Sequence, residues 1–122
     1  MKQMTVVFGA ALLLIGVTAG AASRIQVSVS PRFGFEPTNL VVAVITERHA
    51  DNRILRVVAQ SESFLTSSDR SLDGEDSPRV ARFEFREVPA GAYEIRATLI
   101  GPDGNPRAEA DATATVISRD GY

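Results

Sequence analysis

After residue 24, the sequence alternates between apolar and polar residues with a period of two. In the clearest stretches, every second residue is valine, isoleucine, phenylalanine or alanine, and charged or hydroxylated residues stand between them. A period of two places alternate side chains on opposite faces of a strand, whereas an amphipathic helix needs a period near 3.6. The pattern therefore predicts strands at residues 25–30, 40–47, 53–61, 81–86, 93–99 and 108–117.

Short turn-forming segments separate these predicted strands. Residues 49–52 and 101–106 are rich in Gly, Pro, Asp and Asn, which favour the backbone dihedrals of turns. No window of a dozen residues carries a convincing helical stripe. Strands at short spacing joined by hairpins predict an all-β fold, an antiparallel sandwich of two sheets with about seven strands.

Residues 88–95, with the sequence VPAGAYEI, resemble the turn into the penultimate strand of immunoglobulin-like and fibronectin type III-like domains. In those families a tyrosine near the start of that strand bonds back to upstream backbone, so the resemblance implies this role for Tyr93. The same run, together with Phe83 and Phe85, is also similar to the transthyretin-like modules of many bacterial surface proteins. The chain departs from antibody-type domains because it has no cysteine pair and no tryptophan. The resemblance implies an immunoglobulin-like β-sandwich over residues 23–122.

Residues 1–22 differ in kind from the rest of the chain. Lys2 is the only charged residue before Arg24, and a short apolar run is followed by small residues that end at Ala22. These features predict a secretory signal peptide, cleaved after Ala21 or Ala22. The alternative is an uncleaved anchor, because the apolar run is nearly long enough to span a bilayer. A small exported domain without disulfides fits a bacterial protein of the periplasm, the cell surface or the extracellular space.

The residue inventory argues against several classes of function. The chain has one histidine, no cysteine and a pI near 5.4. It therefore cannot build a thiolate zinc site, and it does not resemble a general nucleic-acid binder. His49 lies beside Glu47 and Asp51 in a predicted turn, where we expect a surface histidine rather than a general base. We expect no catalytic residue, no cofactor and no enzymatic activity.

Two groups of charged residues suggest binding sites, and each has a simpler explanation. Four carboxylates lie within residues 67–78 and could ligate calcium, but their spacing does not match that of an EF-hand calcium loop, so we expect a solvated loop without metal. Arginines at alternate strand positions could form an anion-binding strip, but acidic residues are interleaved with them, so we expect cross-strand ion pairs. The carboxylates are Asp69, Asp73, Glu75 and Asp76, and the interleaved residues are Arg56, Arg82, Arg86, Arg96, Glu84 and Glu94.

Residues 53–61 are apolar on both faces of the predicted strand. Leu55 and Val57 lie on one face, and Ile54 and Val58 lie on the other. Only one face can contact the core of a sandwich, and burying each such side chain contributes roughly 1.5–3 kcal/mol, so the second face needs a cover. In the usual strand order the second face continues to Ile100 on the next strand. We expect residues 62–78 to fold over this face; the alternative is that Ile54, Val58 and Ile100 form a partner-binding strip.

These observations predict a non-catalytic, exported β-sandwich module that binds a protein partner or self-associates in the cell envelope. The alternative is a carbohydrate-binding domain, or an enzyme-accessory or inhibitor domain that acts through a loop. The aromatic residues expected outside the core are Phe33, Phe35, Phe64 and Tyr122, and tryptophan is absent. A carbohydrate binder usually presents several exposed aromatic side chains. Because only these four are expected outside the core and none is tryptophan, the set favours a protein partner. We expect no nucleic-acid partner and no membrane contact after signal cleavage.

Overall fold

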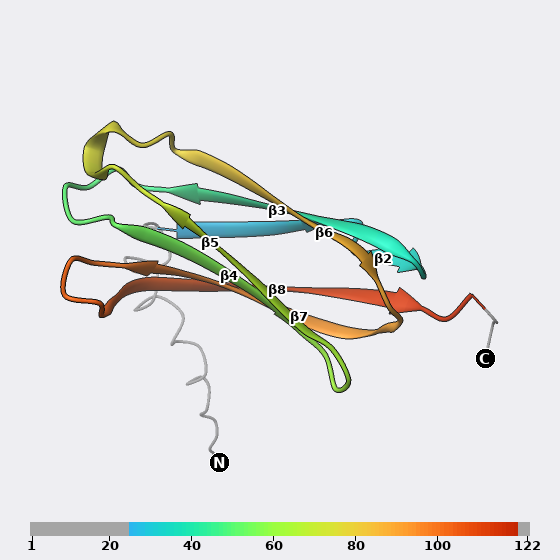
Figure 1. Cartoon of the computed structure of the whole chain (residues 1–122). Coiled ribbons are helices and arrows are strands. Elements are labelled where there is room, and N and C mark those ends of the chain that lie inside the picture. The colour runs from blue at the N-terminus through green and yellow to red at the C-terminus, as the bar shows by residue number, and fades with distance from the viewer. Residues whose placement is uncertain (1–24, 120–122) are drawn as a thin grey trace, which may run out of the picture.

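The computed structural model describes residues 25–119, which form a two-layered β-sandwich (Figure 1). The signal peptide predicted at residues 1–22 lies outside the described residues. The described chain contains eight strands and one short 3₁₀ helix, η2 (Gly74–Asp76). The strands are β1 (Ile25–Ser30), β2 (Phe33–Phe35), β3 (Thr38–Thr46), β4 (Ile54–Gln60), β5 (Leu65–Ser71), β6 (Val80–Val88), β7 (Gly91–Ile100) and β8 (Pro106–Ile117). Among residues 25–119, no helix has the length and apolar character needed to cross a membrane.

The two sheets divide the strands unequally. One sheet has the order β1-β3-β6, and the other has the order β2-β8-β7-β4-β5. The chain passes from one sheet to the other at five connections: β1–β2, β2–β3, β3–β4, β5–β6 and β6–β7. All neighbouring strands are antiparallel except β2 and β8, which run parallel. The predicted two-sheet, all-β sandwich is confirmed, with one parallel pair that the prediction did not include.

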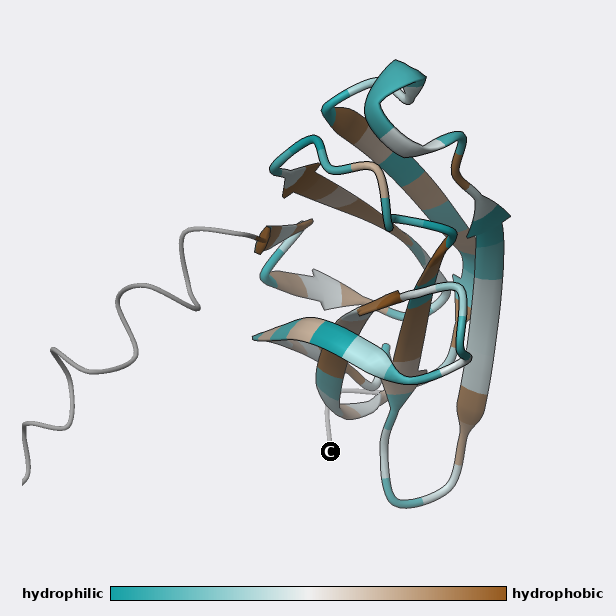
Figure 2. Ribbon diagram, turned by 90° about the vertical axis from the view of Figure 1, so that its left-hand side faces the viewer, coloured by the Kyte–Doolittle hydropathy of each residue, from teal (hydrophilic) through white to brown (hydrophobic). Residues whose placement is uncertain are grey.

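The core lies between the sheets and follows the period of two seen in the sequence. Leu55, Val57 and Ala59 of β4 are fully buried, and so is Ile95 of β7. Brown, apolar segments alternate with teal, hydrophilic segments along the ribbons in Figure 2. Each strand thus contributes one row of side chains to the core and turns the other row outward.

Residues 62–78 do not form the loop that was expected. Seven of them form β5, which pairs antiparallel with β4 along its whole length, from Gln60 opposite Leu65 to Ile54 opposite Ser71. The segment therefore extends the same sheet and does not fold over the outer face of β4, so that expectation is wrong. The sequence pattern does not predict this strand, because its residues, LTSSDRS, do not alternate between apolar and polar. An edge strand outside the core needs none, since its backbone hydrogen bonds hold it in place.

The chain crosses between sheets at its N-terminal end. β1 pairs with β3, and after Pro31 and Arg32 the chain joins the other sheet, where Phe33, Gly34 and Phe35 pair with Thr115, Val116 and Ile117. Figure 1 shows β2 and β8 pointing the same way at the end of the sandwich that carries the C-terminus. This β2 strand was not predicted, because a strand of three residues is too short to show a periodic pattern.

Candidate functional site

The predicted partner-binding strip is only partly assembled. Ile54 of β4 lies opposite Ile100 of β7, as expected, but Val58 lies opposite Arg96, four residues further along each strand. Ile100 is 7% exposed and lies outside the central core cluster, while Ile54 and Val58 are half-buried. The apolar residues therefore do not form one continuous strip, although their ability to bind a partner stays a prediction.

Ion pairs cross the outer face of the same sheet. Arg56 lies between Ile54 and Val58, and its Nε donates to Asp69 Oδ1 of β5 at 2.8 Å. Arg96 Nε donates in the same way to Asp111 Oδ1 of β8 at 2.9 Å. The hydrogen bond from Arg56 lowers the pKa of the Asp69 carboxyl below its ordinary value. The expected cross-strand pairing is found for Arg56 and Arg96, which pair with aspartates rather than with Glu94. Arg86 instead contacts Glu84 on its own strand, at 3.4 Å.

The acidic segment and His49 do not come together as a metal or catalytic site. Asp69 is engaged by Arg56, and the other three carboxylates lie in and beside η2 (Gly74–Asp76). Among residues 25–119, no group of three or more potential metal-ligating side chains is found. His49 is exposed, and its Nδ1 accepts a hydrogen bond from the backbone N–H of Asp51 at 3.0 Å. This arrangement stabilises a turn.

Tyr93 has the position that the family resemblance implied. Its side chain is 2% exposed, and its hydroxyl donates a hydrogen bond to the carbonyl oxygen of Pro89 at 2.8 Å. The ring of Phe64 packs edge-on against it, with 6.3 Å between the ring centroids. The bond to upstream backbone is confirmed, and Phe64, which was expected outside the core, is instead partly buried against it.

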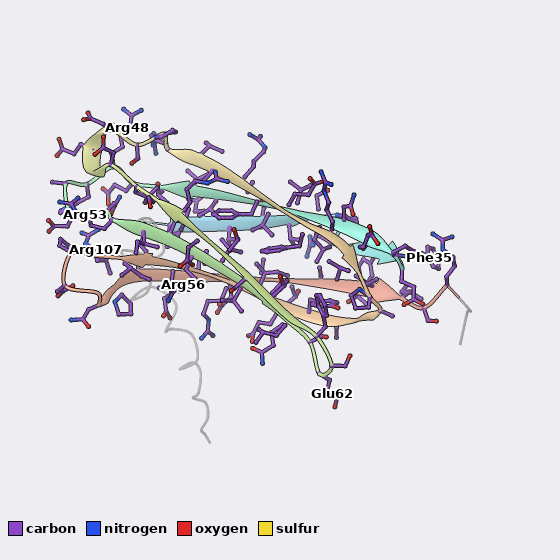
Figure 3. The ribbon with its side chains drawn as sticks, in the orientation of Figure 1. Phe35, Arg48, Arg53, Arg56, Glu62 and Arg107 are labelled. Atoms are coloured by element: carbon purple, nitrogen blue, oxygen red, sulfur yellow. The ribbon has the colours of Figure 1, made fainter. Side chains whose placement is uncertain are left out.

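Asn52 is a buried polar residue whose role sequence reasoning missed. Its Nδ2 donates to the carbonyl oxygen of Glu47 at 2.9 Å, and its Oδ1 accepts from Arg107 Nη1 at 2.6 Å. These bonds join the β3–β4 connection to the start of β8, at the end of the sandwich where Figure 3 labels Arg53 and Arg107. The sequence identified Asn52 only as a turn residue, because Arg107 is distant along the chain. Its function is to hold the loops at this end together.

The largest exposed apolar side chains lie at the opposite end, on β2. Phe33 is 73% exposed and Phe35 is 56% exposed, and Ile117 beside Phe35 on β8 is 40% exposed. Figure 3 shows Phe35 at the end of the sandwich away from Arg53 and Arg107. Because Phe33 and Phe35 are separated by Gly34, both rings lie on the same face of the sheet, together with Ile117. We call these three residues the β2 patch.

β2 is also an edge of its sheet. Among the described residues, β8 is its only neighbouring strand, so its other side has unpaired backbone groups. A groove of about 450 Å³ beside it, between β1 and β8, is lined by Val27, Arg32 and Asp111 among others. Sequence reasoning placed Phe33 and Phe35 outside the core but did not join them to an edge strand. The flanking Pro31 and Pro37 could have indicated one, since prolines are tolerated at sheet edges.

No protein-family model matches the sequence, and no curated protein matches it either. Several solved structures are similar in fold, among them the following three. A family 76 glycoside hydrolase from a bovine Bacteroides thetaiotaomicron strain matches with a TM-score of 0.56 and 19% identity over 75% of this chain, which spans 20% of that protein. The superoxide reductase (neelaredoxin) from Ignicoccus hospitalis matches with a TM-score of 0.56 and 11% identity, over 75% of this chain and 79% of that one.

The third similar structure is of the fibronectin(III)-like modules of CbhA from Clostridium thermocellum. It matches with a TM-score of 0.51 and 16% identity, over 77% of this chain and 97% of that one. At these identities the similarity concerns the fold alone. With the strand order described above, it identifies the fold as an immunoglobulin-like, fibronectin III-like β-sandwich. Because a superoxide reductase shares this fold, the fold does not decide whether the chain is an enzyme.

Proposed function

We propose that this protein is an exported, non-catalytic β-sandwich module of the bacterial cell envelope that binds protein through the β2 patch. The observation that carries the proposal is the exposure of Phe33 and Phe35 on an open sheet edge. Large aromatic side chains gain free energy when they leave water, and exposed apolar patches next to polar surface are typical of interaction sites.

The chemistry of the edge favours a protein partner over other ligands. A partner chain in extended conformation can use the unpaired N–H and C=O groups of β2, while its side chains pack on the two rings. The rest of the outer face offers less, because Arg56 and Arg96 are already paired with Asp69 and Asp111. A second exposed apolar pair, Ile45 opposite Val80 on the other sheet, has no aromatic ring and is less exposed.

The residue set supports a role without catalysis. The only histidine of the sequence is exposed and bonded to a turn, and the sequence has no cysteine to act as a nucleophile. In the described chain, the groove between β1 and β8 is lined by the hydroxyl residues Ser28 and Thr113, but it has no histidine, and its one carboxylate, Asp111, is paired with Arg96. These groups do not form a nucleophile–base pair.

A carbohydrate ligand is the second candidate. The exposed rings of Phe33 and Phe35 could stack on a sugar, and one protein of similar fold is a family 76 glycoside hydrolase. A sugar would use the rings but would leave the backbone groups of the β2 edge unpaired. The two candidates therefore differ in whether a polypeptide lies within reach of Phe33.

Photo-crosslinking in cells tests the proposal. The full chain is expressed with p-benzoylphenylalanine in place of Phe33, and the matched control carries it in place of Leu65, which is 64% exposed at the opposite edge of the same sheet. We expect protein adducts from position 33 and none from position 65. Absence of adducts at position 33, or equal adducts at both positions, would contradict protein binding through the β2 patch.

A further inference from the structure

Residues 31–37 have a two-fold symmetric chemistry centred on Gly34. The sequence is Pro-Arg-Phe-Gly-Phe-Glu-Pro, so each position matches its mirror position in kind, except that Arg32 mirrors Glu36 with the opposite charge. Such a segment is complementary to itself when two copies run antiparallel. In that arrangement each phenylalanine lies opposite a phenylalanine of the other copy, and an arginine lies opposite a glutamate at both ends of the segment.

The backbone of β2 has the right orientation for this pairing. Thr115 N–H donates to the carbonyl oxygen of Arg32 at 2.8 Å, and Glu36 N–H donates to the carbonyl oxygen of Ile117 at 2.9 Å. Residues 32 and 36 therefore direct backbone groups toward β8. Because adjacent residues of a strand direct these groups to opposite sides, the N–H and C=O groups of Phe33 and Phe35 point to the open edge.

We propose that the partner at the β2 patch is a second copy of this chain, paired antiparallel along β2 about a two-fold axis through Gly34. This inference rests on the proposed function, and it names the partner of the same site. In this register Phe33 lies opposite the partner's Phe35, and each such pair exchanges two backbone hydrogen bonds. The rings of both copies then share one face of a continuous sheet, while Arg32 lies opposite the partner's Glu36 on the other face.

The side chains at the ends of the segment can form these ion pairs without losing existing ones. Glu36 Oε1 accepts a hydrogen bond from Ala90 N–H at 3.0 Å, which leaves the second carboxylate oxygen able to accept from a guanidinium. Arg32 is exposed, and among residues 25–119 its side chain has no hydrogen bond or ion pair. Docking of a second copy supplies the partner that Arg32 lacks within one chain.

The same segment limits the assembly to a dimer. Pro31 and Pro37 cannot donate a backbone hydrogen bond, so the pairing ends on both sides of the segment. Two-fold pairing also uses the β2 edge of both copies, which closes the assembly and prevents growth into a fibre. The contact is short compared with a standard protein interface, so we expect a reversible dimer whose population depends on concentration.

The test is sedimentation equilibrium on the full exported chain, over a concentration range of about 10 µM to about 1 mM. The wild type is expected to dimerise. Arg32→Glu places two like-charged pairs across the two-fold axis and is expected to weaken the dimer by about tenfold or more. The double variant Arg32→Glu with Glu36→Arg exchanges the charges and is expected to restore dimerisation. Leu65→Lys, at the opposite edge of the sheet, is the matched control and is expected to dimerise like the wild type.

A second variant keeps the test independent of the Glu36 contact with Ala90. Phe35→Lys changes an exposed side chain and is expected to abolish dimerisation, while its thermal melt shows a folded domain. A wild type that remains monomeric over the whole range overturns the inference, as does a double charge exchange that fails to restore the dimer. A monomer that still crosslinks from position 33 to a different protein would overturn only the identity of the partner. A monomer without crosslinks would overturn the proposed function as well.

Discussion

At the scale of single residues, Tyr93 joins a local sequence motif to the stability of the core. Its ring is buried between the sheets, and its hydroxyl bonds to Pro89 in the turn just before β7. A buried hydroxyl without a partner costs free energy, so this bond fixes how the chain enters the strand. Because the donor and the acceptor lie four residues apart, one short stretch of sequence contains both.

Removal of the Tyr93 hydroxyl should destabilise the domain without emptying the core. We expect Tyr93→Phe to lower the free energy of unfolding by about 1–3 kcal/mol, because the carbonyl of Pro89 loses its donor while the ring remains. Denaturant unfolding measures the change. Glu94→Gln, on the exposed face of the same strand, is the control and should leave the midpoint unchanged. An unaltered midpoint for Tyr93→Phe would show that the bond does not contribute to stability.

Asn52 illustrates what a sequence of this kind does not reveal at the same scale. Its partners are Glu47, five residues away, and Arg107, 55 residues away. An asparagine in a polar turn is common, and nothing near it indicates that the fold will bring β8 to its side chain. The role of Tyr93 was predictable because its partner is local, and the role of Asn52 was not because its partner depends on the tertiary structure.

At the scale of elements, β5 changes the interpretation of the outer face of β4. The sequence indicated correctly that Ile54 and Val58 lie away from the core, but it suggested a loop lying over them. Instead, β5 lies beside β4 in the same sheet and places Asp69 opposite Arg56. The long side chain of Arg56 lies between the two apolar residues, and arginine stems can cover apolar surface while the charged group stays in water.

This arrangement predicts the behaviour of the double variant Ile54→Ala with Val58→Ala. Both side chains are half-buried within one chain, so we expect each truncation to lower the free energy of unfolding by about 1 kcal/mol. Self-association should not change, since the apolar residues are interrupted by Arg56 and Arg96. Leu55→Ala in the core is the reference and should cost about 2–5 kcal/mol. Denaturant unfolding and light scattering measure the two properties. Weaker association with unchanged stability would instead make Ile54, Val58 and Ile100 a binding strip.

β5 also closes the side of the sandwich that faces β6. The guanidinium group of Arg70 lies 4.6 Å from the centre of the Phe83 ring, and its Nη2 donates to the carbonyl oxygen of Arg82 at 2.8 Å. One side chain thus links the two sheets and occupies an unpaired acceptor on the edge of β6. Charged side chains at an edge hinder pairing with other chains. The β2 edge instead exposes two aromatic rings, and this difference makes it the better candidate for pairing with another chain.

At the scale of the whole molecule, the sequence predicted the class of fold and most of the strands. β3, β4, β6, β7 and β8 each pack one apolar row into the core, and that row produces the alternation in the sequence. The sequence did not predict β2 and β5, because neither packs such a row: β2 is three residues long, and β5 is polar on both faces except at Leu65. The candidate site consequently had to be found in the structure, since it depends on which strand pairs with β8.

The export of the whole chain is a separate prediction that depends on residues 1–22. We expect the secreted form to begin at Ala22 or Ser23, because small residues follow a short apolar run there. Intact-mass measurement on protein recovered from the culture medium or the periplasm determines the first residue. As a control, replacement of Ala19 and Ala21 by bulky residues should block this cleavage. A full-length species embedded in the membrane would contradict the prediction and support the uncleaved anchor.

The parallel pairing of β2 with β8 has a consequence for the order of folding. These strands lie at opposite ends of the domain's sequence, whereas β4 with β5 and β7 with β8 are joined by short connections. Bringing distant segments together costs more chain entropy than closing a hairpin, and such contacts form slowly. We therefore expect β2 to join its sheet late, after β8 has been synthesised and paired. The surface that carries Phe33 and Phe35 then exists only on a finished domain, so a partly folded chain cannot take part in assembly through it.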